Sequence, residues 1–227
     1  MCGARRPFFG TTPAVWRCFV VDRIAALLRY LWTYLVVRLG PLWWGVAAVA
    51  GVAASVGCAT VLRSRGRAAR PGRVLCAGLL VSYVAVVIAG TVAVRSRIKS
   101  RVLHLDVAAR LWRVFGQGHA LEPEPMANML MFVPVGFLLP AALGWGARRT
   151  LLSSLALSAC IEAAQYLLAR GECEPADVVL NVAGALVGYA VWRLACWLRS
   201  YAGRRPRHMR GARSYAGTWP RPGSRSS

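Results

Sequence analysis

The sequence predicts an all-α protein: a polytopic transmembrane helix bundle with five spans, or six if a segment near the N-terminus also crosses. Hydrophobic residues make up 57% of the 227-residue chain and charged residues only 16%, with a mean hydropathy of +0.46. A soluble domain of this length would lack the polar side chains needed to cover its surface. The apolar residues also form long blocks, without the three-to-four-residue periodicity that core helices of soluble proteins show. Both observations favour membrane spans.

Residues 1–40 form a basic N-terminal segment for which two structures are open. Its part 16–40 is apolar and aromatic but also charged. At 100° per residue the charges do not collect on one face, so a clean amphipathic helix is not predicted. No small-residue cleavage site is evident, which argues against a removed signal peptide. We expect either an interfacial helix or a tilted extra span. The charges are Arg17, Asp22, Arg23, Arg29 and Arg38.

The membrane bundle is predicted over residues 41–198. Each of its apolar blocks is long enough to cross roughly 30 Å of hydrocarbon as a helix. The first three blocks contain no charge, the fourth contains only Glu162, and the fifth contains only Arg193 near its end. The predicted spans are 41–62, 74–94, 126–147, 150–169 and 178–198.

The arginines predict the orientation of the bundle in the cell membrane. Basic residues cluster at 63–73, at Arg148 and Arg149, and in the tail 199–227, which we expect to be disordered and lipid-facing. The positive-inside rule places these segments, and therefore the C-terminus, in the cytoplasm. The loops 94–126 and 170–177 then lie outside, although the first of them is itself basic.

The same arginines bear on the partners. A net charge of +21 is typical of nucleic-acid-binding proteins, but here the arginines flank apolar blocks, so membrane lipids are the expected partners and nucleic acid is not. The seven cysteines include no C-x-x-C pair, and the three histidines are scattered. We therefore expect no metal site and no cofactor.

Polar side chains gather in the second half of the chain. On the predicted helix 150–169, Ser154, Ser158, Glu162 and Gln165 follow one face, and similar stripes begin at Asp177 and at Asn128. With the orientation above, the stripes meet at one depth under the outer leaflet and form a polar pocket. The predicted pocket residues are Asn128, Ser158, Glu162, Gln165, Arg170, Asp177 and Asn181. Helix packing alone would account for Pro134, Gly136, Gly184 and Gly188, because small residues let membrane helices approach closely.

Glu162 needs a separate explanation. A carboxylate inside a span costs roughly 2.5–3.5 kcal/mol on insertion scales, so it should face the bundle and find a partner. Arg170 and Gln165 are the nearest candidates in the sequence. A structural ion pair with Arg170 and a functional role for the carboxylate are both open.

Three motifs in this region, in this order, resemble the VanZ-like family of membrane proteins. They are an Asn-led helix with an F-x-P-x-G core, an S-x-x-x-E-x-x-Q helix and a D-x-x-x-N-x-x-G-x-x-x-G helix. The resemblance covers residues 74–198. The chain departs from the family pattern at two positions. Gly171 stands where the family usually has an arginine, so that Arg170 is shifted by one residue, and Val182 stands where threonine is common. The motif residues are Asn128, Phe132, Pro134 and Gly136; Ser158, Glu162 and Gln165; and Asp177, Asn181, Gly184 and Gly188.

The resemblance implies a cell-envelope protein, since the founding member is associated with low-level resistance to the antibiotic teicoplanin, a lipoglycopeptide. The first hypothesis is that the pocket binds or excludes an envelope amphiphile, such as a lipid-linked precursor or a lipoglycopeptide. The alternative is an intramembrane hydrolase or transferase acting on a lipid head group, with Glu162 as general base. A transporter is less favoured, because the sequence shows no internal repeat.

Overall fold

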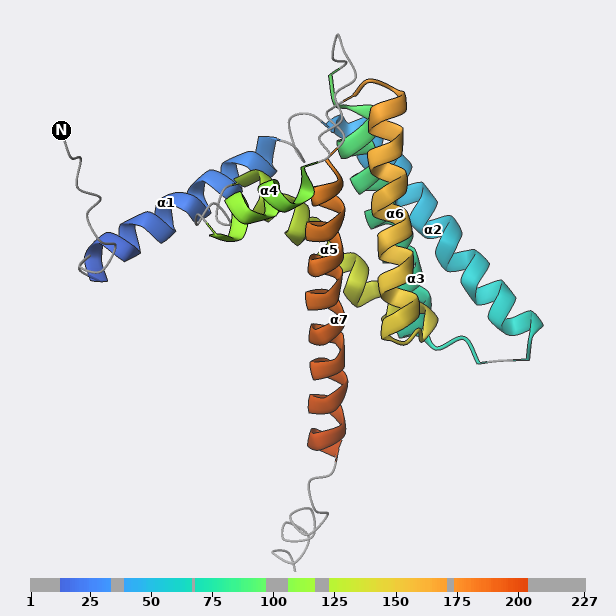
Figure 1. The fold of residues 1–227 in the computed structure, drawn as a ribbon. Coiled ribbons are helices and arrows are strands. Elements are labelled where there is room, and N and C mark those ends of the chain that lie inside the picture. Colours follow the sequence, from blue (N-terminus) through green and yellow to red (C-terminus); the bar gives the residue numbers. More distant parts are fainter. Residues whose placement is uncertain are drawn as a thin grey trace, which may run out of the picture. The chain divides into compact units, whose positions relative to one another are not determined.

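The computed structural model describes residues 13–33, 39–66, 68–96, 106–116, 123–170 and 174–203. In these ranges the chain is helical, and they contain no strand. The helices lie in the order shown in Figure 1. They are α1 (Pro13–Trp32), α2 (Gly40–Ser64), α3 (Pro71–Ile88) with the π-helical turn η2 (Ala89–Ala93), α4 (Val107–Leu111) with the π-helical turn η3 (Trp112–Gly116), α5 (Pro123–Leu143), α6 (Ala147–Leu167) and α7 (Pro175–Gly203).

Five of these helices are long and apolar enough to cross a membrane: α2, α3 with η2, α5, α6 and α7. This confirms the predicted fold class. The helices begin slightly before the apolar blocks, because proline and polar residues also adopt helical geometry in a first turn, where a missing N–H costs nothing. Proline stands in the first turn of α2 and α3, and it opens α5 and α7. Helix α5 ends at Leu143, before the predicted 147, because Gly144 follows with φ +70°.

Helix α1 does not belong to these five. It carries Arg17, Asp22, Arg23 and Arg29 within 20 residues, whereas Arg38 lies outside the described residues. The helix packs against α5, and Leu27 is buried. The choice between an interfacial helix and an extra span therefore stays a prediction, but the helix contacts the bundle.

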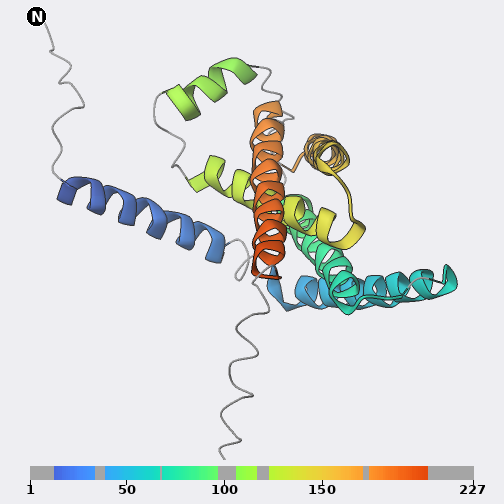
Figure 2. The same cartoon turned by 90° about the horizontal axis from the view of Figure 1, so that it is seen from below.

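Helices α2 and α3 cross at small residues that the sequence analysis did not single out. A Cβ on Gly51 would overlap the Ser82 hydroxyl, and a Cβ on Gly78 would overlap the Ser55 hydroxyl. The Ser82 hydroxyl donates to the Ala47 carbonyl at 2.8 Å. Close approach and an interhelical hydrogen bond are typical of helix pairs in membranes. Figure 2 shows α2 and α3 at an angle to one another, and α3 also contacts α5.

The core lies where α3, α5, α6 and α7 meet around Phe132, whose side chain is fully buried. Helix α5 contains Pro134, which cannot donate to the carbonyl four residues earlier and crowds the turn before it. In that turn the Tyr83 hydroxyl donates to the Met131 carbonyl at 2.9 Å. A neighbouring helix thus supplies a hydrogen bond where proline weakens the helix's own pattern.

Helices α5 and α7 approach backbone to backbone. A Cβ on Gly136 would overlap the Ala185 carbonyl, and one on Gly184 would overlap the Met129 carbonyl. A Cβ on Gly188 would overlap the Val133 carbonyl. The three glycines therefore permit a helix separation that no other residue type allows at these positions.

The chain divides into two units, Met1–Trp192 and Arg193–Ser227. The helix pairs described above lie in the first unit. In the second unit the structure describes the end of α7 to Gly203, where Trp197 and Tyr201 stack with centroids 5.8 Å apart. Residues 199–203 of the predicted tail are therefore helical, and residues 204–227 lie outside the described residues.

Candidate functional site

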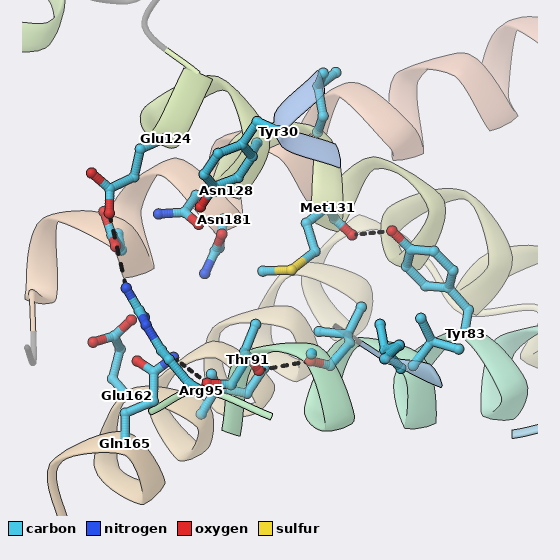
Figure 3. Close-up of a pocket in the computed structure, with 18 residues that line it drawn as sticks. Tyr30, Tyr83, Thr91, Arg95, Glu124, Asn128, Met131, Glu162, Gln165 and Asn181 are labelled. Atoms are coloured by element: carbon cyan, nitrogen blue, oxygen red, sulfur yellow. Dashed lines mark hydrogen bonds and ion pairs between the residues drawn. The ribbon is translucent and has the colours of Figure 1, made fainter. Parts of the chain in front are cut away.

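A cavity of about 250 Å³ lies among α1, α3, α5, α6 and α7. Short connections bring the end of α6 next to the start of α7, and the end of α3 lies against α6 at η2. Figure 3 shows the polar side chains at one end of the cavity and Met131 and Tyr83 at the other. The polar lining is Tyr30, Thr91, Arg95, Glu124, Asn128, Glu162, Gln165, Asp177 and Asn181, and the rest of the lining is mostly apolar.

The polar stripe of α6 faces inward along its whole length. Ser154, Ser158, Glu162 and Gln165 are all buried. Thr150 belongs to the same stripe and is fully buried, although the sequence analysis did not name it. Its position four residues before Ser154 is the signal that could have identified it.

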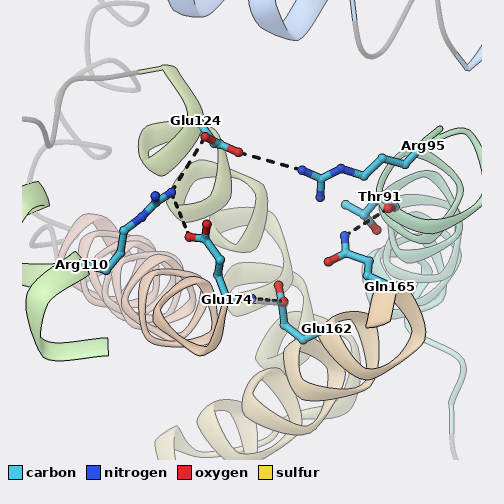
Figure 4. A network of polar contacts seen from close by, with 7 residues as sticks. All are labelled: Thr91, Arg95, Arg110, Glu124, Glu162, Gln165 and Glu174. Carbon is cyan, nitrogen blue, oxygen red and sulfur yellow. Dashed lines mark hydrogen bonds and ion pairs between the residues drawn. The ribbon is translucent and has the colours of Figure 1, made fainter. Parts of the chain in front are cut away.

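The carboxylate of Glu162 is 7% exposed and is held from the start of α7. Its Oε2 accepts a hydrogen bond from the backbone N–H of Glu174 at 3.0 Å. Glu174 in turn forms an ion pair with Arg110 of α4, with Nη2 and Oε2 2.9 Å apart. Figure 4 shows this chain of contacts continuing to Glu124, which lies 3.9 Å from both Arg110 and Arg95. The network ties α4, α5, α6 and α7 together at the polar end of the cavity.

Gln165 and Arg170 bind the carbonyl end of α3. The Gln165 side-chain amide donates to the Thr91 carbonyl at 3.1 Å. The Arg170 guanidinium donates to the carbonyls of Val92, Ala93 and Arg95. These carbonyls belong to the π-helical turn and the residues after it. The last carbonyls of a helix have no N–H partner within the helix, and this end of the helix carries a partial negative charge. Arg170 therefore caps α3 and does not line the cavity. Five of the seven predicted pocket residues do line it: Asn128, Glu162, Gln165, Asp177 and Asn181.

Asn181 lines the cavity and connects α7 to α6. Its side-chain Nδ2 donates to the Ser158 hydroxyl at 2.8 Å, and Ser158 itself is fully buried and does not line the cavity. Asn181 is 2% exposed, and its Oδ1 is buried without a hydrogen-bond partner among the described residues. The Oδ1 of Asp177, one turn earlier on α7, is in the same state. Two acceptors at one end of the cavity are thus left for a donor that the described residues do not supply.

Sequence reasoning missed several residues of the site. Arg95, Arg110 and Glu124 were part of a loop considered only for its charge, and Tyr30 belongs to the segment treated as separate from the bundle. Glu174 contributes both its backbone N–H and its carboxylate. Its place three residues before Asp177, in the connection before a span, is a weak signal, because acidic residues are common at helix starts.

A family model described as VanZ/LLP1 matches residues 74–197, more than half of the chain. The match contains the three motifs and the cavity residues on α3, α5, α6 and α7. Among the described residues, no group of His, Cys, Asp and Glu has the arrangement of a metal site. No curated protein and no solved structure matches the chain.

Proposed function

Because the chain belongs to the VanZ/LLP1 family and has five helices that can span a membrane, we propose that it binds an amphiphile in the cavity between them. The observation that carries the proposal is the composition of the cavity. Met131 lies at one end and the charged and amide groups lie at the other, as Figure 3 shows, and the lining also includes the apolar residues Val86, Val87 and Ile161. A ligand that matches both ends has a polar head group joined to a hydrocarbon chain.

The ligand belongs to the cell envelope in this proposal. A lipid-linked precursor or a lipoglycopeptide such as teicoplanin has the required two-part chemistry, and binding or excluding it would give a resistance-like role. The size of the cavity supports binding of a head group with the first part of its chain, because drug-sized ligands occupy roughly 300–1,000 Å³. Leu130 lines the cavity and is 40% exposed, which leaves a wall through which the remaining chain can reach the bilayer.

The proposal places the protein in the cell membrane with its C-terminus in the cytoplasm and the polar end of the cavity under the outer leaflet. The arginine clusters that begin at the end of α2, in the first turn of α6 and at the end of α7 support this orientation. The polar groups lie at the opposite helix ends, namely the end of α3, the start of α5, the end of α6 and the start of α7.

Cysteine labelling tests this orientation. In a variant whose only cysteine is Cys173, which lies outside the described residues, an impermeant maleimide should label intact cells. In a matched variant whose only cysteine is introduced by Ser64→Cys, at the exposed end of α2, the reagent should label only after permeabilisation. The reverse pattern would move the polar end of the cavity to the cytoplasmic leaflet.

Lipid retention tests amphiphile binding. The purified wild-type protein, analysed by native mass spectrometry after extensive detergent washing, should retain one amphiphile per chain. Asn181→Leu should weaken retention roughly tenfold or more, since it removes a buried amide that would otherwise pair with the head group. Leu130→Trp should also weaken retention, because the larger side chain would obstruct the exposed side of the cavity without removing a hydrogen bond.

The control is Leu143→Trp, which makes the same change on the same helix at a similarly exposed residue away from the cavity. It should retain the amphiphile at the wild-type level. Equal retention by all three variants would show that the bound lipid lies elsewhere. Release of a chemically altered lipid by the wild type but not by Glu162→Gln would favour the hydrolase instead.

A further inference from the structure

We infer that the polar end of the cavity recognises a primary ammonium group on the head of its amphiphile. The inference rests on the proposed function, because it names the chemistry of the ligand that the cavity would bind. It follows from two observations, the balance of charges around the cavity and the buried oxygen atoms that have no donor.

The charges that line the cavity are mostly negative, although the chain as a whole carries +21. Glu124, Glu162 and Asp177 contribute three carboxylates, and Arg95 contributes one guanidinium. That guanidinium lies 3.9 Å from Glu124, and the nearby guanidinium of Arg110 lies 2.9 Å from Glu174. Both cations of the network therefore already face carboxylates. A head group with a net negative charge would have to compete for them while approaching Asp177, so the charge balance opposes an anionic ligand.

Two of the buried atoms without a hydrogen-bond partner belong to side chains that line the cavity, and both are acceptors. Asp177 Oδ1 and Asn181 Oδ1 are buried and have no hydrogen-bond partner among the described residues. Because the two residues are four apart on α7, their side chains lie on the same face of the helix, one turn from each other. A buried acceptor without a donor is unfavourable, and a ligand that donates to it gains correspondingly. A primary ammonium offers three N–H donors and a positive charge, which satisfies both the acceptors and the carboxylates.

The requirement for both a positive charge and N–H donors distinguishes three common lipid head groups. Phosphatidylethanolamine carries a primary ammonium, whereas the trimethylammonium of phosphatidylcholine has charge but no N–H donor. Phosphatidylglycerol has hydroxyl donors but a net negative charge. The hydrophobic wall of Val86, Val87 and Met131 further favours an amine that is attached to a hydrocarbon chain over a soluble amine.

The experiment is a competition between these three lipids, with identical acyl chains, for the full-length protein in detergent, followed by native mass spectrometry. We expect the ethanolamine lipid to bind roughly tenfold more tightly than either of the others, the size expected for a charge-assisted hydrogen bond. Asp177→Asn should remove most of this preference. Asp106→Asn makes the same chemical change at an exposed residue away from the cavity and should leave the preference unchanged.

The outcomes distinguish the inference from the proposed function. Equal or tighter binding of the choline or glycerol lipid, still weakened by Leu130→Trp, would overturn the ammonium assignment and leave amphiphile binding in place. Lipid binding that does not respond to Leu130→Trp at all would overturn both. Glycerophosphoethanolamine has the same head group without acyl chains, and it should compete poorly. Competition as strong as that of the whole lipid would overturn the assignment to an amphiphile.

Discussion

Gly184→Leu should lower the unfolding temperature of the bundle more than any other single substitution considered for α5 and α7. The Cβ alone would overlap the carbonyl of Met129, and the same α5–α7 contact includes Gly136 against Ala185 and Gly188 against Val133. Backbone atoms cannot rotate away as a flexible side chain can, so the two helices would have to separate. Overpacking in cores costs roughly 1–3 kcal/mol and occasionally more, against a total stability of roughly 5–15 kcal/mol. Because α5 contributes Phe132 to the core, its separation from α7 would also expose the centre of the bundle.

The measurement is thermal unfolding in detergent together with size-exclusion chromatography. Gly57→Leu is the matched control, since a Cβ at Gly57 of α2 meets no atom within 4 Å and its neighbourhood is open. We expect this variant to unfold close to the wild-type temperature, and Gly184→Ala to fall between the two. If Gly184→Leu and Gly57→Leu unfolded at the same temperature, the close packing of α5 against α7 would be wrong.

Glu162→Gln should abolish most amphiphile binding while leaving the bundle nearly as stable as the wild type. The side-chain carbonyl of glutamine can still accept the hydrogen bond that the Glu174 backbone donates at 3.0 Å. What the substitution removes is a negative charge that lines the cavity. A charged hydrogen bond contributes roughly 1.5–3 kcal/mol, which corresponds to a loss of roughly tenfold or more in affinity. Lipid retention and thermal unfolding, measured on the same preparation, check both parts.

The competing explanation is that Glu162 serves an ion pair with Arg170. In that case Glu162→Gln would lower stability, and adding Arg170→Ala would restore much of it, because the damage would come from a buried charge left alone. The geometry favours the other outcome. Arg170 donates to three carbonyls at the end of α3, so its loss should itself destabilise the bundle and should not rescue binding. A double variant that regained both stability and binding would overturn the functional role of Glu162.

The spans could be predicted because the hydrophobic effect acts on whole blocks of sequence. An uncharged stretch of about twenty residues has few structures other than a membrane helix, whatever its neighbours are. The ends were less predictable. Leu143 ends α5 because Gly144 adopts a positive φ, and α7 continues past residue 198 to Gly203 because basic and aromatic residues remain helical after the apolar block.

The inward stripe of α6 could also be predicted, since residues three and four apart share a helix face in any environment. Its partners could not. The donors to the carbonyls after Thr91, the pairing of Arg110 with Glu174 and the position of Tyr30 in the cavity depend on how α1, α3 and α4 pack against the other helices. Sequence spacing carries no information on such contacts. For the same reason Arg170 was expected in the pocket, whereas the structure directs its guanidinium to the end of α3.

Amphiphile binding is best tested by a density map of the wild-type protein in lipid nanodiscs made from the membrane lipids of its source. We expect continuous ligand density in the cavity. Its polar end should lie within hydrogen-bond distance, roughly 2.7–3.2 Å, of the Asn181 Oδ1, and its chain should run past Met131 toward the exposed side of Leu130. A well-ordered cavity that contained only water, or one closed by the surrounding side chains, would contradict the claim that this protein binds an amphiphile there.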